Sequence, residues 1–354
     1  MRLYPSRFIA LLLFATFLFV SEAPTLAATP SDTAPPTTTY GETTLHLAGL
    51  ARTRLATQHT SAEGIETPQA SLVMARLRAQ AVHEGAGLVN IELDMALPMR
   101  ILDLYSEVDL GSPISVRVGL FKVPLSREMQ MPIVSHPIFE RSLLNLDLGV
   151  RRRVGATVAA SFELGAMRGN LQTGVFNPTM TFNEGLNDGM LWTSAFDLEF
   201  DTLHTDLHIA YMEHVLAPGE RIDPVTMAPL FPHDHQLDVE LYHERGAVRA
   251  LAEALVAFDN RITGDDTPVW ALHALIAYEL RALPSQEGGH GLEPALSVDY
   301  LSLEDGDHLR VTGNLNWLIV SRKLLASIAY GFEPELGAQQ PARSLGLLQL
   351  QGSF

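Results

Sequence analysis

The sequence contains no cysteine and only two lysines, and beyond Val20 it has no long apolar run. The lack of cysteine excludes disulfide bonds, thiolate metal sites and cysteine nucleophiles. The lack of apolar runs excludes a bundle of membrane-spanning helices, each of which needs about 20 consecutive apolar residues. Phosphate-binding glycine loops and dinucleotide motifs are also missing, and no nucleophile stands beside a base, so we expect no enzymatic activity and no cofactor.

Acidic residues outnumber basic ones. Removing Arg2, Arg7 and Glu22 with the first 27 residues leaves 22 basic and 40 acidic side chains, a net charge of −18. This balance argues against nucleic acid as a partner. A mean hydropathy of +0.11 combined with 18% charged residues suits apolar positions that alternate with wetted ones.

The N-terminus has the features of an export signal. Arg2 and Arg7 precede an apolar stretch from Phe8 to Val20, and the small residues before Ala28 suit cleavage. The stretch is too short to span a bilayer, so residues 1–27 are predicted to be a signal peptide. Residues 28–43 are rich in Pro and Thr and are predicted to be a flexible leader. Residues 44–354 would then form the exported domain.

Apolar and polar residues alternate along most of this domain, which is the period of a strand with one apolar and one polar face. We predict sixteen such strands, near residues 45–55, 71–81, 87–96, 101–110, 114–122, 147–153, 156–167, 191–200, 203–214, 235–244, 247–258, 269–281, 291–302, 308–319, 323–332 and 344–354. So many amphipathic strands predict an all-β fold, an antiparallel transmembrane β-barrel of about sixteen strands in the bacterial outer membrane.

The connections between these segments alternate in length. Tight links at 83–87, 111–113, 201–202, 246 and 320–322 alternate with long ones at 56–70, 123–146, 168–190 and 215–234. Short periplasmic turns and long extracellular loops are typical of outer-membrane barrels, so both termini are predicted to be periplasmic. A soluble two-sheet sandwich is the alternative, but it would need turn signals at both ends of every strand.

The cost of charge in lipid assigns the faces of the strands. A Lys or Arg facing lipid near the bilayer midplane costs about 2–4 kcal/mol, so the charged face is predicted to line the lumen. Aromatic residues then fall near strand ends, where aromatic girdles lie, at Trp192, Trp270, Trp317, Tyr330, Phe332 and Phe354.

One stretch carries a recognisable motif. Residues 115–128 read SVRVGLFKVPLSRE, and FERS at 139–142 and LGV at 148–150 follow. This arrangement resembles the phosphate-selective porin O/P family, in which a similar segment leads through a long loop to ERS and then LGV. The resemblance runs from about residue 70 to the end, although residues 168–290 match by pattern only. It implies a sixteen-stranded, homotrimeric channel for passive diffusion.

The facing assignment turns most charged strand residues inward. The acidic ones are Glu92, Asp94, Asp103, Glu107, Asp109, Asp197, Glu199, Asp206, Asp238, Glu240, Glu253, Glu279, Glu293 and Asp299. The basic ones are chiefly Arg52, Arg54, Arg76, Arg78, Arg117, Arg249 and Arg310. Phosphate selectivity in the resembling family relies on lumenal arginines and lysines. Because carboxylates predominate here, phosphate is not the expected cargo and a weak cation preference is predicted.

Residues 123–146 form the connection after the fifth strand, which folds into the lumen in sixteen-stranded porins. This loop would present four charges there; alternatively, it is an outer surface loop that those charges pin to the wall. The candidate pore-lining and constriction residues are therefore Arg52, Arg54, Arg76, Arg78, Glu92, Asp94, Asp103, Glu107, Asp109 and Arg117 on the wall, with Arg127, Glu128, Glu140 and Arg141 in the loop.

Other polar clusters are interpreted as ordinary surface. His204, Asp206 and His208 alternate on one predicted strand face, and residues 233–235 read HDH in an outer loop. Neither group has a third fixed ligand, so no metal site is predicted. The basic run 151–153 is interpreted as a solvated cluster at a periplasmic turn rather than as an anion site.

The first tight turn predicts a register. A turn centred on Gly85 pairs Arg76 with Asp94 and Arg78 with Glu92, with Gln80 opposite Asn90. Opposite charges on facing strands contribute about 0.2–1 kcal/mol each, which helps to fix hairpin register. We therefore expect close guanidinium–carboxylate approaches for both charged pairs inside the barrel.

Two functions remain open. The first is a porin, a water-filled channel surrounded by outer-membrane lipid that passes small hydrophilic solutes or ions. The second is an occluded barrel with a structural, adhesive or surface-binding role through its outer loops. Single-channel conductance in a planar bilayer distinguishes the two.

Deleting Phe354 is expected to reduce the amount of membrane-inserted, heat-modifiable protein. Phe354 shares a strand face with Leu348, Leu350 and Gly352. A terminal aromatic residue on such a strand is what the outer-membrane assembly machinery is expected to engage. Comparing the gel mobility of heated and unheated samples measures insertion, and insertion equal to that of the parent protein would refute this role.

Overall fold

The computed structural model describes residues 37–353 apart from 41, 61–63, 66–68, 97, 112, 133–134, 139, 179–188, 216–232, 261–267, 282–290, 304–305, 321–323 and 335–341. The predicted signal peptide, most of the predicted leader and Phe354 lie outside the described residues. Within the described part of the chain, no helix has the length and apolar character needed to cross a membrane.

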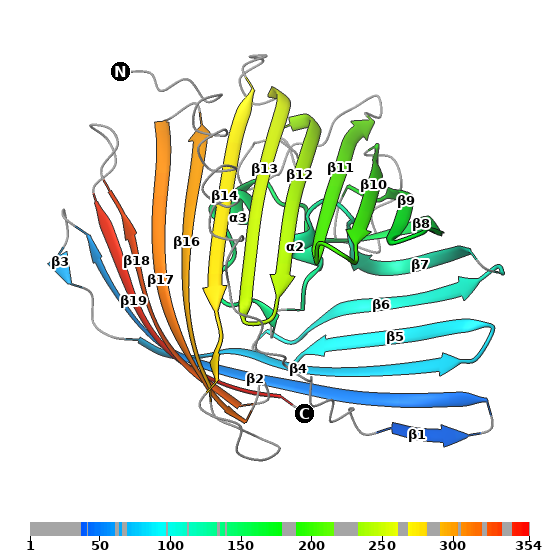
Figure 1. Cartoon of the computed structure of the whole chain (residues 1–354), viewed down its shortest axis with the longest axis horizontal. Coiled ribbons are helices and arrows are strands. Elements are labelled where there is room, and N and C mark those ends of the chain that lie inside the picture. Colours follow the sequence, from blue (N-terminus) through cyan, green and yellow to red (C-terminus); the bar gives the residue numbers. More distant parts are fainter. Residues whose placement is uncertain are drawn as a thin grey trace.

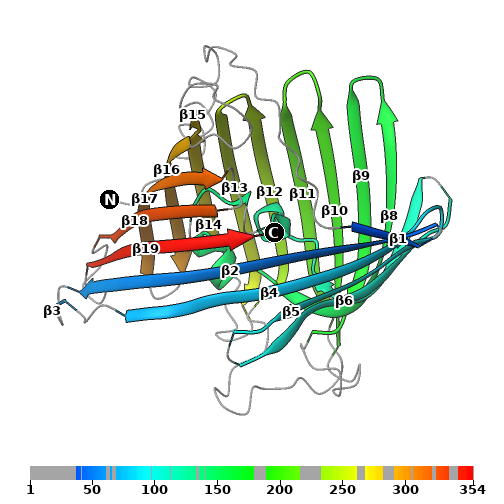
Figure 2. The ribbon, with the colours of Figure 1, turned by 90° about the horizontal axis from the view of Figure 1, so that it is seen from below.

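Sixteen antiparallel strands form a closed barrel, as predicted (Figure 1). They are β2 (Thr43–Thr60), β4 (Gln69–His83), β5 (Gly87–Asp94), β6 (Arg100–Asp109), β7 (Ile114–Lys122), β8 (Arg152–Leu164), β9 (Met167–Phe176), β10 (Met190–Phe200), β11 (Thr205–Val215), β12 (His233–Arg245), β13 (Val248–Asn260), β14 (Val269–Tyr278), β16 (Gly291–Leu303), β17 (Gly306–Val320), β18 (Leu324–Glu333) and β19 (Arg343–Ser353). The first, β2, pairs with the last, β19, so the sheet closes on itself (Figure 2).

Three shorter strands accompany the barrel: β1 (Thr37–Tyr40), β3 (Gly64–Ile65) and β15 (Leu280–Arg281). Strand β1 pairs with residues 43–46 of β2, beyond Leu50, where the pairing of β2 with β19 ends. It therefore covers an edge of β2 that would otherwise expose unpaired backbone groups. The end of the predicted flexible leader is thus a strand.

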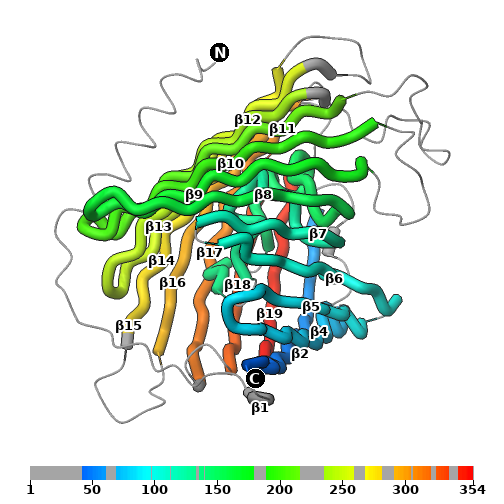
Figure 3. The backbone as a smooth tube through the Cα atoms, turned by 90° about the vertical axis from the view of Figure 1, so that its right-hand side faces the viewer, coloured from blue at the N-terminus to red at the C-terminus, as the bar shows by residue number. Residues whose placement is uncertain are grey.

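Residues 147–176 differ from the prediction. The predicted strand at 156–167 corresponds to β8, but no separate strand lies at 147–153, where helix α3 (Leu143–Asp147) precedes β8. Strand β9 lies in the predicted long connection 168–190 and forms a hairpin with β8 that turns at Gly165, with φ of 63°. Figure 3 shows β8 and β9 between β7 and β10. Glycines made β9 look like a loop, but Gly169 lies opposite Phe162, whose ring occupies the space that a Cβ would need.

Short and long connections separate to opposite ends of the barrel. Residues 84–86, 165–166, 201–204 and 246–247 turn tightly at one end, whereas 123–151, 177–189 and 216–232 are long at the other. Two connections differ: residues 279–290 are a long connection at the end with short turns, and residues 304–305 are a short connection at the end with long loops. The alternation otherwise agrees with the predicted topology.

The outer face of the barrel is apolar. Ile328 is 58% exposed whereas Ser327 beside it is 3% exposed, and the same contrast separates exposed Leu348 from buried Gln349. Trp192, Trp317, Tyr330 and Phe332 are also exposed on this face, whereas Trp270 is half-buried. Apolar side chains thus point out and polar ones in, which is the arrangement required of a barrel in lipid.

Candidate functional site

The connection between β7 and β8, residues 123–151, lies inside the ring of strands (Figure 1, Figure 2). It holds the helices α2 (Arg127–Gln130) and α3. We call it the inserted loop. Its apolar residues pack on the inward side of the wall, in a buried cluster that comprises Phe121, Val123, Leu125, Leu144, Leu148, Val150, Phe176, Leu191, Ala195, Ala210, Met212, Leu255, Ala257, Val269, Ala271 and Leu301. Burial of this apolar surface favours the inserted position.

Local signals in the sequence shape the inserted loop. Ser126 caps α2 by accepting a hydrogen bond from the Met129 amide at 3.3 Å, and Ser142 caps α3 by accepting one from the Asn145 amide at 3.2 Å. The Lys122 ammonium donates to the carbonyl oxygens at the end of α2, including Gln130 O at 3.0 Å. The motif residues that suggested a porin family are therefore those that build this loop.

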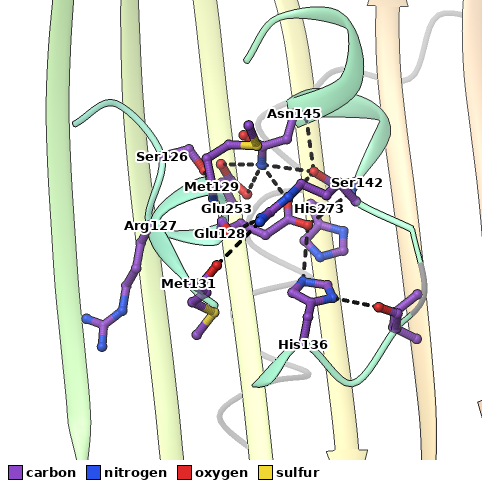
Figure 4. A network of polar contacts seen from close by, with 12 residues as sticks. Ser126, Arg127, Glu128, Met129, Met131, His136, Ser142, Asn145, Glu253 and His273 are labelled. Carbon is purple, nitrogen blue, oxygen red and sulfur yellow. Dashed lines mark hydrogen bonds and ion pairs between the residues drawn. The ribbon is translucent and has the colours of Figure 1, made fainter. Parts of the chain in front are cut away.

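Glu128 lies at the centre of the inserted loop and is fully buried (Figure 4). Its carboxylate accepts hydrogen bonds from Ser142 N at 3.1 Å and Ser142 Oγ at 2.5 Å, and from Asn145 Nδ2. His136 Nε2 lies 3.1 Å from Glu128 Oε1. Burial alone would raise the pKa of the Glu128 carboxyl, but its contact with His136 and the nearby charge of Arg141 lower it overall. The ionised carboxylate thus joins the two helices.

Polar contacts tie the inserted loop to strands around the barrel. The backbone amides of Arg127 and Glu128 donate to Glu240 on β12, and the Arg127 guanidinium pairs with Asp206 on β11. Further links run from Arg54 Nη1 to Glu140 Oε1 at 3.0 Å, from Arg249 Nη1 to Ser135 O at 2.8 Å, from Arg310 Nη2 to Arg141 O at 2.7 Å, and from Asn314 Nδ2 to Pro137 O at 2.6 Å. Of the four predicted loop charges, Arg127 and Glu140 bond to the wall through their side chains, whereas Glu128 and Arg141 do so through backbone atoms.

Basic side chains gather beside the inserted loop, and we call Lys122, Arg52, Arg54, Arg76, Arg141 and Arg152 the basic wall. Arg52 lies close enough to Arg54, Arg76 and Arg141 for their charges to repel, and Arg76 stands in the same relation to Arg152. The Arg152 Nε donates to Asp103 Oδ1 at 2.6 Å. The interpretation of residues 151–153 as a periplasmic-turn cluster is wrong for Arg152, because it lies opposite Lys122 where β8 begins, inside the barrel.

The predicted register of the first hairpin is confirmed. Arg76 lies opposite Asp94, and Arg78 lies opposite Glu92. The contacts, however, run diagonally: Arg76 Nη1 lies 3.4 Å from Glu92 Oε1, and Arg78 Nε donates to Asn90 Oδ1 at 2.7 Å. The predicted direct contacts between opposite residues are therefore wrong. Strand twist instead brings each long side chain to the neighbour two residues along the facing strand.

The remaining wall candidates are spread over several contacts. Asp94 accepts a bond from the Ala96 amide at 3.1 Å and contacts Arg100. Glu107 pairs with Arg117 at 2.6 Å. Asp109 is exposed at the end of β6, away from the inserted loop. The structure thus gathers part of the predicted set at the loop and leaves Glu107, Asp109 and Arg117 elsewhere on the wall.

Carboxylates on the opposite side of the barrel lie beneath the inserted loop. We call Asp238, Glu240, Glu253 and Asp299 the acidic wall; each is at most 3% exposed. Asn145 Nδ2 donates to Glu253 at 3.1 Å, and His273 Nδ1 lies 2.7 Å from Asp299 Oδ1. The two-residue period of the strands predicted that these groups face inward. It did not predict that a loop would cover them and exclude water.

The histidines are not grouped as the sequence suggested. His204 lies in the turn after β10, with φ of 52°, and does not share a strand face with Asp206 and His208. His208 instead lies opposite Glu240 on β12, with Asp238 on the same face. His235 contacts Tyr211 at 2.8 Å; the side chains of residues 233 and 234 lie outside the described part.

The fold is similar to that of solved outer-membrane proteins. A trimer form of OmpT, an outer-membrane protein of Vibrio cholerae, is 11% identical with a TM-score of 0.58 over 88% of this chain and 99% of that chain. An anion-selective porin from Comamonas acidovorans is 10% identical with a TM-score of 0.58, covering 88% and 100%. The outer-membrane channel DcaP of Acinetobacter baumannii is 11% identical with a TM-score of 0.57, covering 91% and 100%. At such identities the likeness shows a shared fold.

No protein-family model and no curated protein matches the chain. The resemblance to the phosphate-selective porin O/P family is therefore not confirmed.

Proposed function

We propose that the chain is an outer-membrane porin through which small hydrophilic solutes diffuse passively. The observation that carries this proposal is the inserted loop, which docks on strands around a closed barrel and leaves charged side chains on β2, β4 and β8 partly exposed. A cleft of about 190 Å³ lies between Glu140 of the loop and the inward side of β17, β18 and β19. A narrowed, charge-lined lumen of this kind suits a diffusion channel and requires no catalytic group.

The balance of charge beside the inserted loop is basic. Arg54, Arg76 and Arg152 are 15–22% exposed and pair with Glu140, Glu92 and Asp103, which are 12–28% exposed. The other members of the basic wall add positive charge there, whereas the acidic wall is buried under the loop. The predicted weak cation preference assumed that all inward carboxylates are exposed to water in the lumen. Because buried carboxylates attract mobile ions less than wetted arginines do, we propose a preference for small anions instead.

Reversal potentials in a KCl gradient test this proposal. The protein is expected to conduct and to prefer chloride, most strongly at low salt, where screening is weakest. The double variant Arg54→Gln, Arg76→Gln should move the reversal potential toward cation preference. Arg168→Gln is the matched control, since Arg168 pairs with Glu199 and Asp201 at an exposed strand end. A barrel that inserts but does not conduct would contradict the channel, and cation preference in the parent would contradict the selectivity.

We also propose that the barrel is a homotrimer, because one structural neighbour is known in a trimer form. Chemical crosslinking of the protein in native membranes tests this assembly.

A further inference from the structure

Three ligand-type side chains meet beneath the inserted loop on β11 and β12. His208, Asp238 and Glu240 each offer one atom, and these atoms lie within 4.8 Å of one another. All three residues are buried, at 3%, 0% and 0% exposure. The strand register explains the meeting, because His208 lies opposite Glu240 and Asp238 is two residues before Glu240 on the same face.

Asp238 lacks a compensating donor. Neither of its carboxylate oxygens has a hydrogen-bond partner among the described residues, although the side chain is fully buried. The neighbouring Glu240 receives only backbone amides, and the Arg127 guanidinium is turned to Asp206. A buried ionised carboxylate without a donor or counterion is strongly unfavourable, so the Asp238 and Glu240 carboxyls must either share a proton or be compensated by a cation.

The hydrogen bonds of His208 also indicate a place for a cation. Its Nδ1 lies 2.7 Å from Asp197 Oδ1, where it donates a proton. In the neutral imidazole Nε2 then bears a lone pair, yet Nε2 lies 2.9 Å from the carbonyl oxygen of Leu125 in the inserted loop. With a neutral imidazole, two acceptors would face each other at this point, beside two carboxylates, and a bound cation would join them. A carboxylate behind Nδ1 is also the usual support of a metal-binding histidine.

We propose that His208 Nε2, Asp238 and Glu240 bind a divalent transition-metal ion, with the Leu125 carbonyl as a further ligand. An imidazole among carboxylate oxygens favours Zn²⁺ or Mn²⁺ over Ca²⁺ and Mg²⁺, which prefer all-oxygen sites. Ligand bonds of about 2.0–2.2 Å require the side chains to draw together by small rotations. The ion would fasten the start of the inserted loop to β11 and β12.

Metal titration of the chelator-treated, detergent-purified barrel tests this site, and it does not depend on channel activity. Calorimetry with Zn²⁺ alone is expected to show one ion per chain, and added Zn²⁺ should raise the unfolding temperature. Asp197→Asn should weaken binding about 10–100-fold, as expected for a residue that supports a ligand. Asp238→Asn should weaken it at least as much.

Glu107→Gln is the control, since it removes an inward carboxylate that pairs with Arg117 on a part of the wall away from the inserted loop and the proposed ligands. Its loss of affinity should be clearly smaller than that of Asp238→Asn. Heat-modifiability on gels verifies that each variant is folded. Absence of Zn²⁺ binding by the folded parent would overturn the proposal. Binding that Asp238→Asn does not weaken, or binding of Ca²⁺ but not Zn²⁺, would also overturn it.

Discussion

Replacing Glu128 with alanine is expected to undock the inserted loop from the inner wall of the barrel. The substitution removes the carboxylate that accepts bonds from Ser142 and Asn145 and contacts His136. Breaking a buried, charged network by removing one partner costs about 3–5 kcal/mol. The population of undocked loop should therefore rise by a factor on the order of a hundred or more.

Limited trypsin digestion measures this release, because an undocked loop exposes the peptide bonds after Arg127 and Arg141. Single-channel recording should show larger and noisier conductance in the same variant. Glu140→Gln serves as the control: Glu140 is in the same loop, but its side chain is 28% exposed, and each of its ion pairs, with Arg54 and with Arg310 at 3.8 Å, is worth only about 0–1 kcal/mol. Equal protease resistance in Glu128→Ala and the parent would show that the network does not hold the loop.

Replacing Leu144 with alanine is expected to loosen the same loop through its apolar contacts. Leu144 is fully buried between α3 and the inward side of the wall. A buried Leu→Ala change costs about 2–5 kcal/mol, since it removes apolar contacts and leaves a cavity. Tryptic cleavage of the loop should accelerate while insertion of the barrel into the membrane is preserved.

Leu146→Ala is the matched comparison for this prediction. Leu146 is on the same short helix and is 41% exposed, so its truncation removes few contacts. It should leave the cleavage rate within a few-fold of the parent. If the two leucine variants behave alike, the buried apolar cluster is not what docks the loop.

The barrel was largely predictable because the alternation of apolar and polar residues within each strand is a local sequence signal. In β18, Ile328, Tyr330 and Phe332 face outward while Ser327 faces inward, as the two-residue period requires. The same period and the turn at Gly85 were sufficient for the register of β4 and β5. The failure at β8 and β9 has a local cause too: Gly169 and Gly174 interrupt the apolar pattern of β9, and only the facing Phe162 and Thr157 show why glycines are there.

The candidate site was predictable in its parts but not in its arrangement. Glu128 and Arg141 were recognised as loop charges. Nothing near them in the sequence, however, indicates that Glu128 contacts Ser142 or that Arg141 contacts Met131. Arg152 and Lys122 were overlooked as lumen residues, although a basic residue at the end of a strand was a usable signal: Lys122 ends β7 and Arg152 begins β8. Asp238 was assigned inward without any indication that it would be buried.

The sequence by itself determined the strand pattern, the outward apolar face and the first hairpin, because periodicity and tight turns involve residues close together in the chain. Only the tertiary structure decided which inward charges remain wet and which are sealed. That outcome depends on the inserted loop, which brings Leu125 to His208, 83 positions away, and Asn145 to Glu253, 108 positions away. Burial of a charge is set by what packs over it, and this covering segment comes from a distant part of the chain.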